Sequence, residues 1–170
     1  MSINPEDIRL RSLVVDDAER ISFLLNNKNV WDNLRDYVPF PYSKIDAQEF
    51  IAHSSKPDSN IFAIVFKNEF CGVISLEQLK DVYRLSAEIG YWIGEPFWGK
   101  GIASQAVKLI TDFGFRELPL ERIFASVFEH NKASMRVLEK NGYRLESIAK
   151  NAVIKNKVIS NQYTYAILKT

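Results

Sequence analysis

Two glycines, Gly99 and Gly101, stand between a strand-like and a helix-like stretch and have the spacing of a phosphate-binding turn. Glycine allows a tight turn and lets a ligand approach the main chain without a Cβ in the way. Residues 87–93 are aromatic and β-branched, which predicts a strand, and residues 103–110 have the apolar spacing of a helix. The unpaired N–H groups of a first helical turn bind phosphate readily. Residues 95–104 therefore indicate a phosphate cradle, although an ordinary strand-to-helix turn explains the two glycines equally well.

Two common cradle motifs fit this stretch incompletely. Residues 94–100 match the first seven positions of the nucleoside-triphosphate P-loop, but Gly101 stands where Ser or Thr should bind Mg²⁺. The dinucleotide fingerprint needs a glycine where this chain has Ser104 and an acidic residue at the end of the next strand, whereas Glu121 would open that strand. An enzyme that uses a nucleoside triphosphate stays as an alternative, to be revived by Mg²⁺-dependent ATP binding.

A third cradle fits, because residues 98–103, Trp-Gly-Lys-Gly-Ile-Ala, resemble the pyrophosphate loop of the GNAT superfamily of acetyl-CoA-dependent N-acetyltransferases. The usual form of that loop is Arg/Gln-x-x-Gly-x-Gly/Ala. Trp98 departs from it, but Trp-Gly-Lys-Gly is typical of the branch similar to the ribosomal-protein N-terminal (Rim-type) acetyltransferases. Residues 87–93 resemble the fourth strand of that branch, and residues 131–143 resemble its second CoA-side helix and exit turn. The resemblance extends from about residue 8 to residue 169.

The resemblance implies that acetyl-CoA is the cosubstrate and that main-chain groups hold it. It assigns the pantetheine arm to the end of the strand and to Asn131, and the pyrophosphate to the cradle, where Lys100 adds positive charge. The implied residues are Tyr91, Trp92, Ile93, Trp98, Gly99, Lys100, Gly101, Ile102, Ala103, Ser104 and Asn131. Other roles are open for some of them: the rings of Tyr91 and Trp92 as core, Lys100 as a solvated charge, and Asn131 as a helix N-cap.

Glu88 is the candidate general base. An amine acceptor with a pKa near 10.4 is mostly protonated at neutral pH, and a carboxylate can take its proton directly or through water. Glu88 alternates with Ser86 and Gly90 on one face of an otherwise apolar strand, so the charge needs a partner or a task. A structural ion pair with Arg84 or Arg122 would also satisfy it, and Glu77 is the reserve candidate. The resemblance further implies that Ser134 acts as a general acid or stabilises the thioester sulfur.

The acceptor segment is expected between the first two strands. The resemblance places helices there that close over the acceptor, so we expect Trp31, Arg35 and Tyr37 near the substrate. A capped surface loop with packed aromatic residues is the other interpretation. Cys71 lies in the middle of a predicted strand and away from both histidines in the sequence, which favours direct attack by the amine over an acetyl-enzyme.

The whole-chain properties exclude several classes of protein. A net charge of +1 argues against a nucleic-acid-binding protein, and one cysteine cannot form an internal disulfide. No apolar run approaches the length of about 20 residues that a membrane span needs, and the chain opens with no leader. His53 and His130 make no metal-ligand spacing, so we expect no metal. We expect a cytoplasmic protein without nucleic-acid or membrane partners, and the resembled branch forms monomers or homodimers.

The 170 residues predict a single domain, residues 1–170, with its core at about 8–169. The expected order is one strand, three short helices, three strands, a helix, a strand, a helix and two strands. We expect Asp16 or Asp17 to cap the first helix, a second helix at residues 29–36, and Asp46 to cap the third. This is the GNAT order, a mixed α/β fold with about seven strands in a twisted sheet and helices on both faces.

These observations lead to one main function and one alternative from another class. The main hypothesis is transfer of the acetyl group of acetyl-CoA to a primary amine, on a protein N-terminus or a small molecule, by direct attack in a ternary complex. The alternative is a catalytically inactive acyl-CoA-binding sensor or scaffold. The presence of both Glu88 and Ser134 favours the enzyme.

Overall fold

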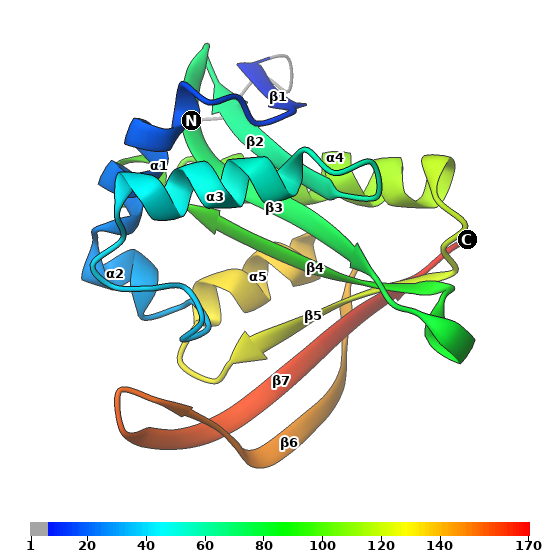
Figure 1. Cartoon of the computed structure of the whole chain (residues 1–170). Helices are drawn as coiled ribbons and strands as arrows, with labels where there is room; N and C mark the ends of the chain where they lie inside the picture. The colour runs from blue at the N-terminus through cyan, green and yellow to red at the C-terminus, as the bar shows by residue number, and fades with distance from the viewer. Residues whose placement is uncertain (1–6) are drawn as a thin grey trace. The chain divides into compact units, whose positions relative to one another are not determined.

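A computed structural model describes residues 7–170 of the chain. The elements follow one another in the predicted order (Figure 1), and their bounds are β1 Ile8–Arg11, α1 Asp17–Leu25, α2 Lys28–Trp31, α3 Lys44–Ser54, β2 Asn60–Phe66, β3 Glu69–Gln78, η2 Asp81–Tyr83, β4 Ser86–Ile93, η3 Glu95–Phe97, α4 Ile102–Glu117, β5 Arg122–Phe128, α5 Lys132–Lys140, β6 Arg144–Lys155 and β7 Val158–Leu168.

Hydrogen bonds join the strands into a mixed seven-stranded sheet in the order β1-β2-β3-β4-β5-β7-β6. β4 and β5 are parallel, whereas β1 with β2, β5 with β7 and β6 with β7 are antiparallel. The predicted mixed α/β fold class is therefore confirmed.

The chain divides into two compact units that share β3 and β4. Among the described residues, the first unit comprises those up to Ser75 together with Tyr91–Ala106, and the second comprises Leu76–Gly90 and Val107–Thr170. The single domain expected from chain length stays a prediction.

In the first unit, α1 buries an apolar stripe, and α3 lies beside α1 and β2 (Figure 1). The stripe consists of Ala18, Ile21, Leu24 and Leu25.

The boundaries and caps of the helices in this unit correct three expectations. Asp16 is the N-cap of α1 but makes no capping hydrogen bond through its side chain. The carboxylate of Asp17 instead accepts the N–H of Val14 at 2.9 Å and pairs with Arg11 at 2.7 Å. α3 begins three residues early, because Ser43 caps it and Asp46 is the N3 partner of a capping box. α2 ends at Trp31 rather than at residue 36, since tight turns follow it.

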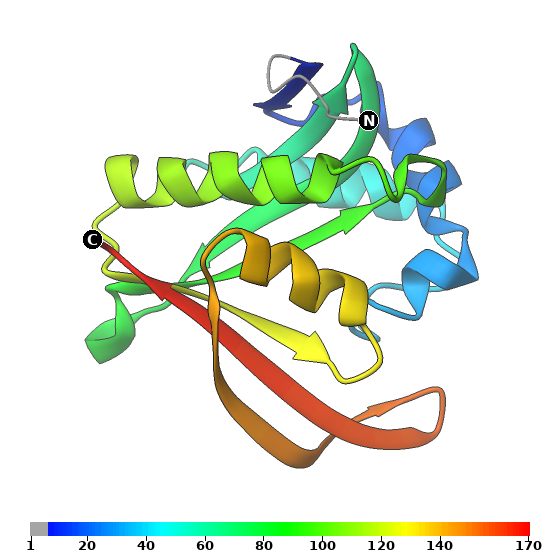
Figure 2. The same ribbon diagram turned by 180° about the vertical axis from the view of Figure 1, so that it is seen from behind.

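In the second unit, α5 lies against β7 (Figure 2): the Tyr165 hydroxyl donates to the Glu139 carboxylate at 3.0 Å, and the Lys132 ammonium lies 5.0 Å from the centre of the Tyr163 ring. α5 ends in a left-handed turn, where the sequence resembles the exit turn of the family. Gly142 has a φ of 82°, and its N–H donates to the Glu139 carbonyl at 3.0 Å.

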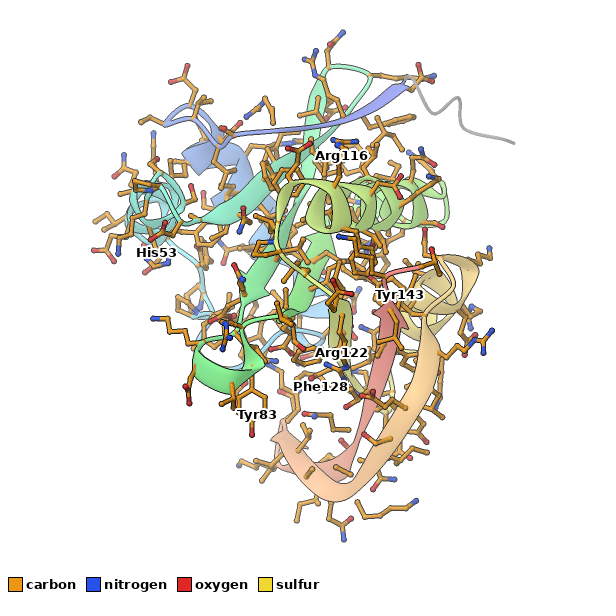
Figure 3. The ribbon with its side chains drawn as sticks, turned by 90° about the vertical axis from the view of Figure 1, so that its right-hand side faces the viewer. His53, Tyr83, Arg116, Arg122, Phe128 and Tyr143 are labelled. Atoms are coloured by element: carbon orange, nitrogen blue, oxygen red, sulfur yellow. The ribbon has the colours of Figure 1, made fainter. Side chains whose placement is uncertain are left out.

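The core of this unit includes the apolar face of β5, which runs from Arg122 to Phe128 (Figure 3). The largest fully buried side chains around it are Ile110, Leu120, Ile123, Leu138 and Tyr143. Tyr143, also labelled in Figure 3, shares a buried hydrogen bond of 2.8 Å with the hydroxyl of Thr111.

Candidate functional site

The predicted cradle lies where β4 ends and α4 begins. β4 is fixed at its end, because the N–H of Gly94 donates to the carbonyl of Cys71 on β3 at 2.9 Å. One turn later, the indole N–H of Trp98 donates back to the carbonyl of Ile93 at 2.7 Å. Trp98 therefore ties the cradle to the strand, and 43% of its surface stays exposed.

The two glycines of the cradle have backbone conformations that other residues adopt at a cost. Their φ angles are 72° for Gly99 and 76° for Gly101, in the left-handed region. A Cβ built on Gly99 would meet no atom within 4 Å. The space next to the main chain is thus open for a ligand group, and a side chain would fill it.

The amide groups at the start of α4 complete the cradle. At the start of this helix, the N–H of Gln105 donates to the carbonyl of Gly101 at 3.1 Å. The amides of Ile102, Ala103 and Ser104 precede it, at the positive end of a 16-residue helix. This arrangement fits a pyrophosphate, which needs N–H donors and positive potential.

Lys100 supplies an exposed positive charge within the cradle segment. It is exposed, and its ammonium lies 5.6 Å from the centre of the Phe97 ring. The guanidinium of Arg20 lies 5.8 Å from the same ring. Phe97 is buried and so gives Lys100 a fixed apolar support.

The end of β4, with Tyr91, Trp92 and Ile93, lies very close to β3. A Cβ built on Gly72 would stand 2.2 Å from the carbonyl oxygen of Trp92, a distance that no real side chain tolerates. Tyr91 and Trp92 are half-buried, and the ring of Trp92 lies 6.2 Å from that of Phe70. Gly72 therefore sets the path of the main chain to which the pantetheine arm was assigned.

The predicted acceptor segment belongs to the same unit as the cradle. The indole N–H of Trp31 donates to the carbonyl of Val38 at 2.8 Å, and its ring packs on Phe40 at 5.3 Å. Trp31 thus shapes the loop that follows α2. Arg35 and Tyr37 are exposed on that loop, Tyr37 to 80%. They are accessible to a substrate, and their role stays a prediction.

Glu88 lies on β4 in the second unit, opposite Phe124 of β5. The predicted alternation is present: Ala87 and Ile89 are buried, whereas Glu88 is partly exposed. Arg122 pairs with Glu146 and Arg84 donates to the carbonyl of Asp81 at 3.1 Å, and an ion pair of Glu88 with either arginine stays an alternative to its role as a base.

The start of α5 carries the two other predicted residues of the second unit. The side-chain oxygen of Asn131 accepts the N–H of Ser134 at 3.1 Å, so the N-cap role of Asn131 is confirmed. Ser134 is partly exposed on the first turn of this helix.

Sequence reasoning missed the clamp that holds the loop between β5 and α5. The carboxylate of Glu129 accepts the N–H of Asn161 at 3.1 Å and its side-chain amide at 3.0 Å, and the N–H of Glu129 donates back to the carbonyl of Asn161 at 3.1 Å. The side-chain oxygen of Asn161 also accepts the N–H of Asn151 at 3.0 Å. Glu129 is two residues before Asn131, so this clamp fixes the start of α5. No local pattern marks a pair separated by 32 positions.

Three negative findings concern residues 7–170. None of the helices in that range is long and apolar enough to cross a membrane. Within the same range, no three His, Cys, Asp or Glu side chains gather as metal ligands would. Cys71 is buried in the described chain and is not paired with another cysteine.

Comparisons with known proteins identify relatives along nearly the whole chain. The family model described as an acetyltransferase (GNAT) domain matches residues 7–144. The chain is 33% identical over 169 residues to the probable N-acetyltransferase YjcK of Bacillus subtilis (strain 168), covering 95% of this chain and 93% of that protein. It is 31% identical over 170 residues to the putative ribosomal N-acetyltransferase YdaF of the same strain, covering 96% and 92%.

A solved structure gives the same result. The microcin C7 self immunity acetyltransferase MccE, solved in complex with acetyl-CoA and AMP, superimposes with a TM-score of 0.84 at 25% identity, covering 99% of this chain and 96% of that one.

Proposed function

Because the chain belongs to the GNAT family of acetyl-CoA-dependent N-acetyltransferases, we propose that it transfers the acetyl group of acetyl-CoA to a primary amine by direct attack in a ternary complex. The cradle carries the proposal: two left-handed glycines, open space beside Gly99, and the amides at the positive end of a long helix. Acetyl-CoA supplies an activated acyl group as a thioester.

The proposal assigns the cosubstrate to main-chain groups. The pyrophosphate takes the amides of residues 98–104 with the charge of Lys100, and the pantetheine arm takes the main chain of Tyr91, Trp92 and Ile93. Asn131 contacts the same arm in addition to capping α5. Backbone recognition explains how Trp98 can replace the usual Arg or Gln, since its indole is used to hold the strand end.

Two side chains carry the proton transfers in this proposal. A C–N bond to the acceptor forms and the C–S bond of the thioester breaks. Glu88 takes the proton that the acceptor nitrogen loses, and the hydroxyl of Ser134 gives a proton to the leaving sulfur. Glu77, which is exposed on β3, is the reserve base.

Direct attack is supported by the state of Cys71. Burial raises the pKa of this thiol to about 12, and its Sγ donates to the carbonyl of Ile64 at 3.2 Å. A thiol of this kind is protonated and inaccessible at neutral pH, so it is a poor nucleophile for an acetyl-enzyme.

The acceptor, the compartment and the oligomeric state are parts of the proposal. One relative is named as a putative ribosomal N-acetyltransferase, so a protein N-terminus is one acceptor class to test, and a small-molecule amine is the other. Trp31, Arg35 and Tyr37 are the proposed acceptor-side residues. We propose a cytoplasmic monomer or homodimer that does not bind nucleic acid.

Titration calorimetry with acetyl-CoA, CoA and ATP–Mg²⁺ in parallel, followed by a CoA-release assay with peptide and polyamine acceptors, tests this function. We expect binding of the two CoA ligands and release of CoA that depends on an amine. Binding without turnover on any acceptor would leave the acyl-CoA-binding scaffold as the function. ATP–Mg²⁺ binding with no response to CoA would contradict the cradle assignment itself.

A further inference from the structure

The carboxylate of the first cradle residue joins the cradle to the helix that begins the acceptor segment. Glu95 is the first residue of η3, and both of its oxygens accept side-chain amides from α2. Asn29 donates to one oxygen at 2.9 Å, and Asn27 donates to the other in a short hydrogen bond. The partners are 66 and 68 positions apart in the chain, so this is a tertiary contact within the first unit.

On the helix side, the same asparagines form the start of α2. The side-chain oxygen of Asn27, the N-cap, accepts the N–H of Asn29 at 2.9 Å. The carbonyl of Asn27 accepts the N–H groups of Val30 and Trp31, at 3.1 and 2.9 Å. Each asparagine thus donates its side-chain N–H to Glu95, while the side-chain and main-chain oxygens of Asn27 accept hydrogen bonds from the first N–H groups of α2. The position of Glu95 and the start of α2 are therefore fixed together.

On the cradle side, Glu95 belongs to the turn that places Trp98. The main-chain carbonyl of Glu95 accepts the N–H of Trp98 at 3.0 Å, and the Trp98 indole in turn holds the carbonyl of Ile93. The start of this turn packs tightly against α1, since a Cβ built on Gly94 would stand 2.7 Å from the side chain of Leu24. A displacement of the cradle therefore moves the carboxylate on which α2 is anchored.

We propose that Glu95 is a positioning residue that couples the cradle to α2, so that cosubstrate bound in the cradle orders the acceptor segment of residues 31–37. The inference rests on the proposed function for its catalytic consequence. Asn27 and Asn29 transmit a movement of Glu95 to α2, because both donate hydrogen bonds to its carboxylate. α2 has only four residues, and a helix this short has little stability of its own. Its order must come from contacts of this kind.

The arrangement argues against a role for Glu95 as a second general base. The amide of Asn27, and after it the amide of Asn29, lower the pKa of the Glu95 carboxyl below its ordinary value. A carboxylate that is stabilised by two donors is a weaker proton acceptor than an ordinary one. Its chemistry suits a permanent anchor.

The test uses the full-length protein and the variants Glu95→Ala, Glu95→Gln and Asn29→Ala. Glu49→Gln, an exposed glutamate on α3 of the same unit, is the matched control. Hydrogen exchange at the amides of Val30 and Trp31 is followed with and without saturating acetyl-CoA. In the wild type we expect acetyl-CoA to slow this exchange by about tenfold or more, and in Glu95→Ala we expect most of that effect to be lost. Glu49→Gln should behave as the wild type.

Kinetics provide the second readout. In Glu95→Gln and Asn29→Ala we expect KM for the acceptor to rise by about tenfold, while the Kd for acetyl-CoA changes by less than about threefold. The double variant Glu95→Gln/Asn29→Ala should show no further loss, because the two residues share one contact. If Glu95 had a purely structural role, its variants would have a lower Tm, but the ratio of KM for the acceptor to Kd for acetyl-CoA would stay as in the wild type.

The outcomes separate this inference from the proposed function. Equal protection of Val30 and Trp31 by acetyl-CoA in the wild type and in Glu95→Ala would overturn the coupling, as would an absence of protection in the wild type. If Glu95→Ala does not fold, Glu95→Gln decides the question by the same exchange measurement. If no amine acceptor supported CoA release, the acetyltransferase proposal would be contradicted. The hydrogen-exchange measurement would still show whether acetyl-CoA binding is coupled to α2.

Discussion

Cys71 shows at the scale of one residue why the environment decides chemistry. Its thiol is fully buried, bonded to the carbonyl of Ile64, and has a pKa raised to about 12. We expect Cys71→Ala to retain kcat within about twofold, since direct attack does not use the thiol. The free energy of unfolding should fall by about 1–3 kcal/mol because of the lost packing and hydrogen bond. Loss of turnover in a folded Cys71→Ala protein would favour an acetyl-enzyme.

Glu88 is the residue on which the proposed chemistry depends most. We expect Glu88→Gln to lower kcat by about 10²–10⁴-fold, the usual contribution of a general base, and to leave the affinity for acetyl-CoA nearly unchanged. Glu77→Gln on the neighbouring strand is the matched control. The measurement is steady-state kinetics beside titration calorimetry. An unchanged kcat in Glu88→Gln, with a fall in Glu77→Gln, would transfer the role to the reserve carboxylate.

Asp17 is a buried carboxylate whose role is to join two elements. It is 5% exposed, forms two hydrogen bonds of 2.7 Å to Arg11, and accepts the N–H of Val14. Asp17→Asn keeps the size but loses the charge, so we expect a loss of about 1–3 kcal/mol in the free energy of unfolding. Asp16→Asn changes an exposed neighbour and should cost less than about 0.5 kcal/mol. Urea denaturation of both variants measures the difference.

At the scale of elements, Gly99 and Gly72 are required for different reasons: Gly99 leaves room for a ligand in the cradle, and Gly72 lets β3 and β4 approach each other closely. Gly99→Ala meets open space, so its cost in stability is the left-handed strain of about 1–2 kcal/mol. It also puts a methyl group into the cradle, and we expect the Kd for acetyl-CoA to rise by about tenfold or more. Gly72→Ala is different, since its Cβ would strike the main chain of Trp92.

We expect Gly72→Ala to lower the free energy of unfolding by more than about 3 kcal/mol, because β3 and β4 would have to separate. Thermal denaturation and titration calorimetry of both variants check the contrast. A Gly99→Ala protein that binds acetyl-CoA with wild-type affinity would remove the pyrophosphate from this turn.

The clamp formed by Glu129 and Asn161 makes the free energy of unfolding depend on pH. The N–H of Asn161 is the main cause that lowers the pKa of the Glu129 carboxyl, and the Asn161 side chain, Lys132 and Lys150 act in the same direction. The folded state thus favours the ionised form. The contribution of Glu129 is fully present above the ordinary carboxyl pKa, about 4.3, and is lost as the pH falls through the lower pKa of the folded state.

We expect Asn161→Ala to be less stable than the wild type at pH 7 and the difference to shrink below about pH 4. Urea denaturation at several pH values measures it, with Glu121→Gln as a control for an exposed carboxylate. A difference that stays constant down to the lowest pH would show that the clamp does not depend on the charge of Glu129.

The elements that the sequence predicted well are those with a local cause. The element order, the strand at residues 87–93 and the helical spacing of residues 103–110 agree with the structure, since strand composition and apolar spacing are readable in a short window. The capping side chains were wrong at Asp16, Asp17 and Asp46, and the third helix starts earlier than expected, because several acidic and hydroxyl residues compete for each cap. Which residue caps a helix depends on partners outside that helix, as the ion pair between Asp17 and Arg11 shows.

The candidate site divides in the same way. Glycines, a strand end and a helix start make the cradle, and all three can be read locally. The contacts of Glu95 with Asn27 and Asn29, and of Glu129 with Asn161, join positions far apart in the chain. Asparagine and glutamate at the surface are common, so nothing in the sequence singles out these pairs. The residues that hold a site are therefore harder to predict than the residues that form it.

At the scale of the whole molecule, ligand binding should raise the stability of the entire chain. A ligand at a concentration 100 times its Kd adds about 2.7 kcal/mol to the free energy of unfolding. For a protein of this length each kcal/mol corresponds to about 2–4 °C, so we expect acetyl-CoA to raise Tm by about 5–11 °C. ATP–Mg²⁺ at the same concentration should leave Tm unchanged.

The same experiment tests the single domain. β3 and β4 each give residues to both compact units, so neither unit keeps its own strands intact if the other unfolds. We therefore expect one calorimetric transition, which acetyl-CoA moves as a whole although its predicted cradle belongs to the first unit. Two transitions, of which acetyl-CoA moves only one, would mean that the units unfold independently and that the chain is two domains joined through shared strands.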